Sequence, residues 1–184
     1  MKKVLTIIGI TLGAFLAIFF IGAALLPGDY EVERSIIIEA PREAVYAYTT
    51  NLRTRQEWSP WAKADETAVF KYAGTGKQVG DSYSWTGNKM GEGQLTIKVL
   101  DPPERFVSEL QFVEPFEDVL EEEILFEPAA GNTKVYWISR GNLPYPLMRW
   151  FGLILPDQIG AELEQGLQLL KQELERSDSA STAI

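Results

Sequence analysis

The side chains available for chemistry in this sequence are carboxylates, amines, guanidinium groups, hydroxyls and indoles. The 184 residues contain no histidine and no cysteine, so the commonest metal ligand and the thiolate nucleophile are both missing. Proton transfer would have to use a carboxylate, a tyrosine, a lysine or water, and a carboxylate base would need a pKa raised towards neutrality. We therefore expect no metal ion and no cofactor, and we favour binding over catalysis.

Glu122 is the strongest candidate for a chemical role among the acidic side chains. In residues 119–127 a period of two places it on one strand face together with apolar side chains. An inward carboxylate either pairs with a base or has a raised pKa. The alternative is a rim position, or a β-bulge that returns the carboxylate to water. Arg140 has three possible roles: it pairs with Glu122, it binds a ligand carboxylate through two parallel hydrogen bonds, or it lies on the surface of its own strand.

Aromatic side chains form the second group of candidates. Strand alternation directs one set to the inward face, where it either lines a pocket or fills the core: Tyr83, Trp85, Phe112, Phe126 and Trp137. Trp58 and Trp61, on either side of Ser59-Pro60, either flank a pocket entrance or close the core beneath a helix. The complete set of ligand-binding candidates is Trp58, Trp61, Tyr83, Trp85, Phe112, Glu122, Phe126, Trp137, Arg140 and Leu163.

The elements that position these residues are predicted by changes in hydrophobic period. A strand over 30–39 ends at Ala40-Pro41, where the proline favours the first turn of a helix that continues to about residue 55. Alternating segments bounded by turn residues predict antiparallel strands over 68–72, 81–86, 94–100, 106–113, 119–127 and 134–141. A helical period returns in 145–155 and in an apolar stripe over 159–174.

This order predicts an α+β domain in which one curved antiparallel sheet wraps around a long C-terminal helix. A pocket between sheet and helix follows naturally from the curvature. The domain is expected to comprise residues 29–176, with residues 177–184 as a disordered tail. The segment 145–155 is expected either to cap the cavity as an ordinary helix, or to act as a lid or touch a bilayer.

Residues 1–28 form a separate N-terminal segment. Residues 4–26 carry no charge and span about 34 Å as a helix, enough for a hydrocarbon core of about 30 Å. Lys2 and Lys3 precede them, so the positive-inside rule predicts a single-pass anchor with a cytoplasmic N-terminus and a periplasmic or extracellular domain. The alternative is a cleaved signal peptide. Gly9 and Gly13 form one GxxxG pair, which allows a weak homodimer.

The charge of the molecule limits its partners. The chain has 17 basic and 26 acidic residues, a net charge of −9, and no basic stripe interrupts this excess. A nucleic-acid backbone would be repelled. We therefore expect no nucleic-acid partner.

The sequence resembles the START-like superfamily, also labelled SRPBCC, which includes polyketide cyclases, Bet v 1-type allergens and lipid-transfer domains. The similarity covers about residues 30–175 and points to the bacterial polyketide-cyclase-like branch. It rests on Glu39-Ala40-Pro41, Trp58-Ser59-Pro60-Trp61, Gly80 with Tyr83 to Asn88, Gly91-Glu92-Gly93, Pro102-Pro103, Phe112 with Pro115, Trp137 with Gly141, and Glu164 to Lys171. The resemblance implies a helix-grip fold with an apolar cavity for lipids, sterols, polyketides or similar molecules.

Three functions are consistent with these features. The leading hypothesis is a membrane-anchored domain that binds a small hydrophobic molecule without converting it. The second is a polyketide cyclase or dehydratase-like enzyme that orients its substrate with groups such as Arg140, Glu122 or Tyr83 and lets water transfer protons. The third is a cell-envelope interaction module with a filled interior.

Overall fold

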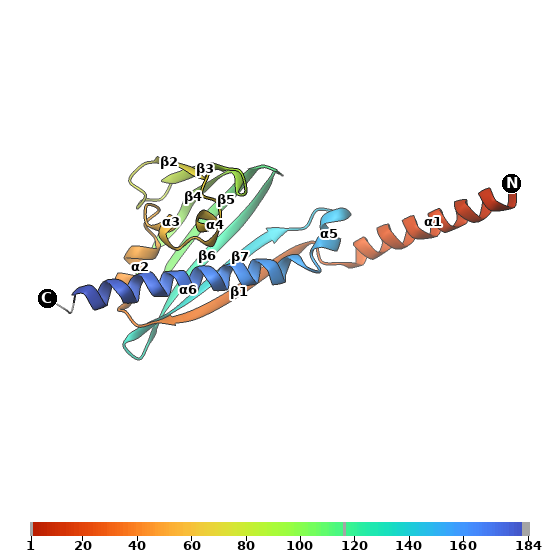
Figure 1. Cartoon of the computed structure of the whole chain (residues 1–184). Coiled ribbons are helices and arrows are strands. Elements are labelled where there is room, and N and C mark those ends of the chain that lie inside the picture. Colours follow the sequence, from red (N-terminus) through yellow and green to blue (C-terminus); the bar gives the residue numbers. More distant parts are fainter. Residues whose placement is uncertain (1, 116, 182–184) are drawn as a thin grey trace.

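The computed structural model describes residues 2–115 and 117–181. Figure 1 shows the elements, which follow one another along the chain as α1 (Lys2–Leu25), β1 (Asp29–Ile38), α2 (Arg42–Thr49), α3 (Arg55–Trp58), α4 (Pro60–Ala64), β2 (Val69–Ala73), β3 (Ser82–Gly87), β4 (Gly91–Asp101), β5 (Arg105–Glu114), β6 (Asp118–Ala129), β7 (Asn132–Asn142), α5 (Leu147–Phe151) and α6 (Leu155–Ser181).

Within the described residues the strands form one sheet in the order β1-β7-β6-β5-β4-β3-β2, with every neighbouring pair antiparallel. Two register shifts interrupt β4, between Glu92 and Gly93 and between Ile97 and Val99. Such irregularities bend a strand and increase its twist. The sheet curves around α6 (Figure 1), which confirms the predicted α+β helix-grip fold.

The leucine stripe of α6 holds the helix against the sheet. Its members are fully or almost fully buried: Leu163, Leu167, Leu170 and Leu174. Burial of each such side chain contributes about 1.5–3 kcal/mol relative to exposure. The spacing of four, three and four residues keeps them on one helical face, so the sequence pattern identifies the face of α6 that the sheet covers.

The first helix after β1 is shorter than predicted. It ends at Thr49, because the Leu52 amide turns away to donate to the Gly76 carbonyl (2.9 Å) and the Asn51 side chain accepts from the Arg53 amide (3.1 Å). The chain then enters α3, whose first residue, Arg55, is buried. This break directs an arginine into the domain interior.

The C-terminal helices also differ from the expectation. The segment 145–155 contains only the short α5, which is followed by turn hydrogen bonds before α6 begins at Leu155. Helix α6 continues to Ser181, so residues 177–181, expected in a disordered tail, are helical. Residues 182–184 of that expected tail lie outside the described residues.

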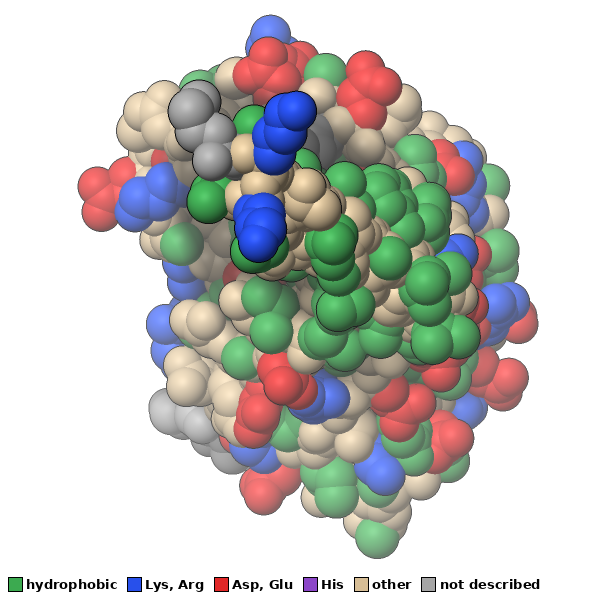
Figure 2. Space-filling model, turned by 90° about the vertical axis from the view of Figure 1, so that its right-hand side faces the viewer, with side chains coloured by type: hydrophobic (Ala, Val, Ile, Leu, Met, Phe, Trp, Pro, Cys, Tyr) green, Lys and Arg blue, Asp and Glu red, His purple; other side chains and the backbone are tan. Residues whose placement is uncertain are grey.

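Helix α1 projects away from the sheet at the end where α5 lies (Figure 1). Its most apolar window has a mean hydropathy of 2.7, and the helix is long enough to cross a membrane. Viewed from this end in Figure 2, hydrophobic side chains gather in one broad area with acidic and basic side chains scattered around it. The exposed apolar residues outside α1 include a group in or beside α5: Tyr145, Leu147, Phe151, Leu153 and Ile154.

Candidate functional site

A cavity of about 170 Å³ lies between the inner face of the sheet, α4 and the N-terminal part of α6. Apolar and aromatic side chains make up most of its wall. The lining residues are Arg55, Ser59, Trp61, Tyr83, Trp85, Met90, Leu110, Phe112, Leu120, Glu122, Ser139, Ile159, Glu162 and Leu163. A mainly apolar enclosure with a few polar groups is the usual composition of a small-molecule site.

The cavity is placed towards the end of the domain that carries α1. Ile159 belongs to the first turns of α6, which follows α5 directly. Leu120 lies near the start of β6, and the paired strand β7 ends at Asn142 opposite Asp29, shortly after α1. Any route along the sheet from the cavity to α1 is therefore short.

Trp85 reaches the cavity because Gly93 has no side chain. The two residues are directly opposite each other on β3 and β4, and a Cβ at position 93 would collide with the Trp85 ring and with the Gln111 carbonyl. The indole packs edge to face with Phe112, with ring centroids 5.6 Å apart. This explains the glycine within an otherwise regular strand.

Polar contacts fix two parts of the cavity wall, one between α4 and α6 and one at the turn between β3 and β4. The Trp61 indole N–H donates to the Glu162 carboxylate (2.7 Å), which ties α4 to α6. The turn between β3 and β4 carries Met90, and its Lys89 and Met90 amides donate to the Asp65 carboxylate at 2.6 and 2.9 Å. Hydrogen bonds, first that of the Thr67 hydroxyl, hold the pKa of Asp65 well below its usual range.

The structure brings together most of the candidates predicted from the sequence. The six that line the cavity are Trp61, Tyr83, Trp85, Phe112, Glu122 and Leu163. Phe126 instead packs against Tyr46 in the core, with ring centroids 5.2 Å apart. Burial raises the pKa of the Tyr83 hydroxyl, while the Arg55 charge opposes that effect. Tyr83 therefore stays neutral in this site, with its hydroxyl oxygen facing the Arg55 guanidinium as an acceptor.

Trp58 and Trp137 also lie in the core, where they hold Arg55. Both indoles are fully buried and pack edge to face, with centroids 5.2 Å apart. The Arg55 guanidinium carbon lies 4.4 Å from the Trp58 centroid and 4.8 Å from the Trp137 centroid. Cation–π attraction at desolvated sites stabilises such an arrangement. These tryptophans therefore act on the cavity through the arginine between them.

Glu122 points inward, as the strand alternation indicates, and no bulge returns it to water. Its carboxylate lies 2.6 Å from Arg55 Nη2, and both side chains are almost completely buried. The Ser108 hydroxyl lies 3.5 Å from the same carboxylate oxygen, at the limit for a hydrogen bond. The base that pairs with Glu122 is therefore Arg55 and not Arg140.

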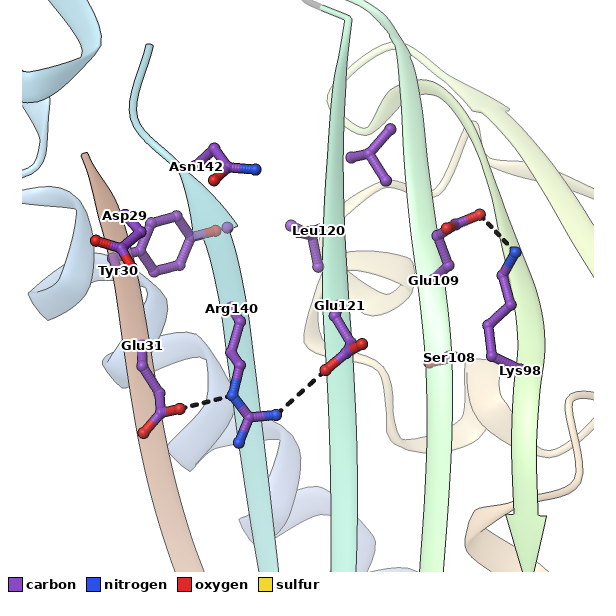
Figure 3. A pocket seen from close by; sticks show the side chains of 12 residues that line it. Asp29, Tyr30, Glu31, Lys98, Ser108, Glu109, Leu120, Glu121, Arg140 and Asn142 are labelled. Atoms are coloured by element: carbon purple, nitrogen blue, oxygen red, sulfur yellow. Dashed lines mark hydrogen bonds and ion pairs between the residues drawn. The ribbon is translucent and has the colours of Figure 1, made fainter. Parts of the chain in front are cut away.

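Arg140 lies on the opposite face of the sheet, because it neighbours the inward Ser139 along β7. Figure 3 shows its side chain between Glu31 and Glu121, and it also contacts Glu123 at 2.7 Å. Burial favours the neutral form of Glu123, but hydrogen bonds from Arg140 and Arg105 outweigh burial and lower its pKa. The depression of about 510 Å³ on this face is lined by groups that already pair with one another, such as Lys98 with Glu109 (2.8 Å).

Sequence reasoning missed Arg55 as a site residue. The signal was its position three residues before Trp58, which puts both on one face of a short helix. The break in the helix after Thr49 is the reason that Arg55 was missed, because in a continuous helix the Arg55 side chain would point in a different direction. Among the described residues, no group of three or more acidic side chains is placed to hold a metal ion.

Comparison with known proteins identifies relatives of this domain. Residues 29–175 match the family model described as polyketide cyclase / dehydrase and lipid transport. No curated protein matches the chain. Solved structures with the same fold include CV1439 from Chromobacterium violaceum (19% identity, TM-score 0.57, covering 82% of this chain and 99% of that one). Others are TTHA0849 from Thermus thermophilus (16%, 0.60, 80% and 99%) and Ara h 8.0201 (12%, 0.56, 81% and 99%).

Proposed function

The chain belongs to the polyketide cyclase/dehydrase and lipid transport family, and from this premise we propose that it binds a small hydrophobic molecule at a membrane surface without converting it. The observation that carries the proposal is the apolar, aromatic cavity between the sheet and α6. Its volume of about 170 Å³ is below the range of about 300–1,000 Å³ common for drug-sized ligands. The cavity therefore suits a small molecule, or the end of a longer one that extends through the mouth.

The proposal of binding without conversion is supported by the state of the polar groups in the cavity. A general base needs a free lone pair within reach of the proton it removes. The Glu122 carboxylate is held by Arg55 at 2.6 Å, and Glu162 accepts the Trp61 indole hydrogen. Both acidic groups of the lining are thus held by structural contacts through Oε2, which restricts how each could turn towards a substrate proton.

Membrane attachment through residues 1–28, with residues 29–176 as the binding domain, is the second part of the proposal. Helix α5 packs on the last turns of α1, where the Trp150 ring stacks on Phe19 with centroids 6.0 Å apart and its N–H donates to the Phe19 carbonyl (3.2 Å). Phe19 lies six residues before the end of α1, a rise of about 9 Å. Helix α5 would then lie within the interfacial layer of a bilayer spanned by α1.

The side chains around α5 fit this location. Tyr145 donates to the Phe20 carbonyl (3.2 Å) and Arg149 to the Ala23 carbonyl (3.2 Å). Tyrosine, tryptophan and arginine are typical of the boundary between hydrocarbon and headgroups. With Lys2 and Lys3 on the cytoplasmic side, the binding domain would lie in the periplasm or outside the cell, with its cavity turned towards the membrane.

The proposal is tested on the full chain, extracted gently from membranes, by mass spectrometry of the small molecules that co-purify. Leu110→Trp fills the cavity, because Leu110 lines it and is 9% exposed. Val113→Trp on the same strand is the matched control, because Val113 is 46% exposed. We expect one hydrophobic compound to be enriched in the wild type and in Val113→Trp and to be absent from Leu110→Trp, with unchanged circular dichroism.

The opposing outcomes are equally specific. Equal small-molecule content in the wild type and Leu110→Trp would contradict binding in this cavity. Conversion of the recovered compound on incubation with the protein would favour the cyclase or dehydratase function. A stoichiometric protein partner with no enriched small molecule would favour the envelope interaction module.

A further inference from the structure

The cavity contains one buried ion pair in a wall that is otherwise mainly apolar. The side chains of Arg55 and Glu122 are 3% and 2% exposed. Transfer of two charges out of water costs free energy that their attraction seldom repays in full, and an apolar pair of the same shape often stabilises a fold equally well. Stability therefore does not explain why a charged pair occupies this position.

The guanidinium is fixed in place on several sides. Its Nη2 contacts Glu122, and its plane lies close to the Trp58 and Trp137 rings. Its other terminal nitrogen, Nη1, is buried and has no hydrogen-bond partner among the described residues. An unpaired buried donor is costly, and this one belongs to a side chain that lines the cavity. The Tyr83 hydroxyl, in the same lining, interacts with this guanidinium but completes no hydrogen bond to Nη1, so an oxygen acceptor brought by a ligand would satisfy this donor.

We infer that Arg55 Nη1 is the anchor for a neutral oxygen acceptor on the cavity's ligand, a ketone, ester, amide or alcohol oxygen attached to an apolar body. This inference rests on the proposed binding function and specifies the ligand class. The apolar body would contact the rings of Trp85 and Phe112, and the oxygen would accept from Nη1. The fixed guanidinium loses little freedom when it donates, which favours a specific hydrogen bond.

The charges around the cavity select against an anionic ligand. Arg55 is the only basic residue among the described lining residues, and Glu122 already neutralises it. Glu162 adds a second negative charge to the same wall. A ligand carboxylate at Nη1 would lie near the Glu122 carboxylate without a further cation to balance it, and like charges at such distances repel strongly in a low-dielectric site.

Three small probes with equal chain lengths test the inference: 2-heptanone, heptane and heptanoate. Their affinities for the full chain in lipid nanodiscs are measured by saturation-transfer NMR, with empty nanodiscs to correct for partitioning into lipid. Arg55→Lys keeps a cation for Glu122 but supplies a single nitrogen, so the ion pair remains and the anchor is removed. Arg53→Lys is the matched control, because Arg53 is exposed and contacts Tyr72 outside the cavity.

We expect the wild type and Arg53→Lys to bind 2-heptanone about tenfold more tightly than heptane or heptanoate. In Arg55→Lys the preference for the ketone should vanish while heptane binding remains. If Arg55→Lys fails to fold, the double variant Arg55→Met with Glu122→Met, which buries no charge, should show the same selective loss.

The inference is overturned if the wild type binds 2-heptanone and heptane equally, if heptanoate binds most tightly, or if Arg55→Lys retains the ketone preference. Each of these results leaves hydrophobic binding in the cavity intact. Absence of binding of all three probes to the wild type would instead contradict the proposed function, and the anchor with it.

Discussion

Asp65 shows how a single side chain positions part of the cavity wall. Its carboxylate accepts hydrogen bonds from the amides of Thr67, Lys89 and Met90 and from the Thr67 hydroxyl. It therefore joins the end of α4 to the turn between β3 and β4, and Met90 in that turn lines the cavity. The hydrogen bonds favour the ionised form, which explains the lowered pKa of this carboxyl.

We predict that Asp65→Asn lowers the urea midpoint of the full chain in detergent at neutral pH, since an amide nitrogen cannot accept from the Lys89 and Met90 amides. The folded pKa is lower than the ordinary value of 3.8, so the carboxylate stabilises the fold above about pH 4. This contribution is lost as the pH falls towards the folded pKa. Tryptophan fluorescence should show a difference between variant and wild type that shrinks on acidification.

Glu66→Gln is the control for Asp65→Asn, because Glu66 is the exposed neighbour and the substitution removes the same charge. It should leave the midpoint almost unchanged. An Asp65→Asn deficit that stays constant from neutral to acidic pH would show that the carboxylate does not act through its ionised form.

For single residues, the sequence predicted the sheet face on which a side chain lies better than it predicted the residue with which that side chain pairs. Alternation in residues 119–127 correctly turned Glu122 inward, since a regular strand reverses its side chains at every residue. It did not identify the partner, because Arg55 is 67 positions away along the chain. Arg140 was a candidate on chemistry alone, yet its place next to the inward Ser139 directs it to the outer face.

Among the elements, α6 carries two glycines, Gly166 and Gly160, and only one of them is needed for its close approach to the sheet. A Cβ at Gly166 would lie 2.5 Å from the Trp137 ring and 3.3 Å from Pro60 Cδ, both in the packed interior. A Cβ at Gly160 would collide only with the guanidinium end of Arg34, a flexible group. The first glycine is therefore required by packing, and the second is not.

We predict that alanine destabilises the fold at Gly166 and does not at Gly160. Gly166→Ala should lower the free energy of unfolding by about 1–3 kcal/mol, because the buried Trp137 ring cannot move aside. Gly160→Ala should leave it unchanged or raise it by up to about 1 kcal/mol, since alanine favours helix and Arg34 can shift. Chemical unfolding of both variants measures the difference. Equal destabilisation by both would contradict the close approach of α6 at Trp137.

Element types were predictable because their periods are long and regular. Each predicted strand corresponds to one of β1 to β7, and the leucine stripe identified α6. Element ends were less predictable where tertiary contacts decide them. The break after Thr49 depends on a hydrogen bond from Leu52 to Gly76, which no local pattern in the first helix reveals.

At the scale of the whole molecule, the two ends of the domain differ in chemistry. The end that carries α1 presents the exposed apolar group around α5 and the nearby cavity. The opposite end carries the loop between β2 and β3, with Asp81 accepting from the Gly76 and Lys77 amides. Hydrogen bonds, first that of the Thr75 hydroxyl, lower the pKa of Asp81, so polar contacts to one carboxylate hold this loop together. This difference between the two ends matches a domain that contacts a membrane at the end carrying α1.

We predict that an environment-sensitive fluorophore at position 151 lies in the bilayer interface and that one at position 79 lies in water. The chain has no cysteine, so Phe151→Cys and Val79→Cys each provide one attachment site, and both native residues are exposed, at 47% and 61%. In proteoliposomes the probe at 151 should be shifted to the blue and quenched by lipids brominated near the headgroup, because α5 is tied to the last turns of α1.

The probe at 79 should show neither effect, and in intact spheroplasts a membrane-impermeant reductant added outside should bleach it. Protection of that probe until the membrane is permeabilised would place the domain in the cytoplasm, against the direction set by Lys2 and Lys3. A water-like spectrum at both positions would separate α5 from the membrane. The cavity would then have no direct path to lipid, and its ligand would have to arrive through water.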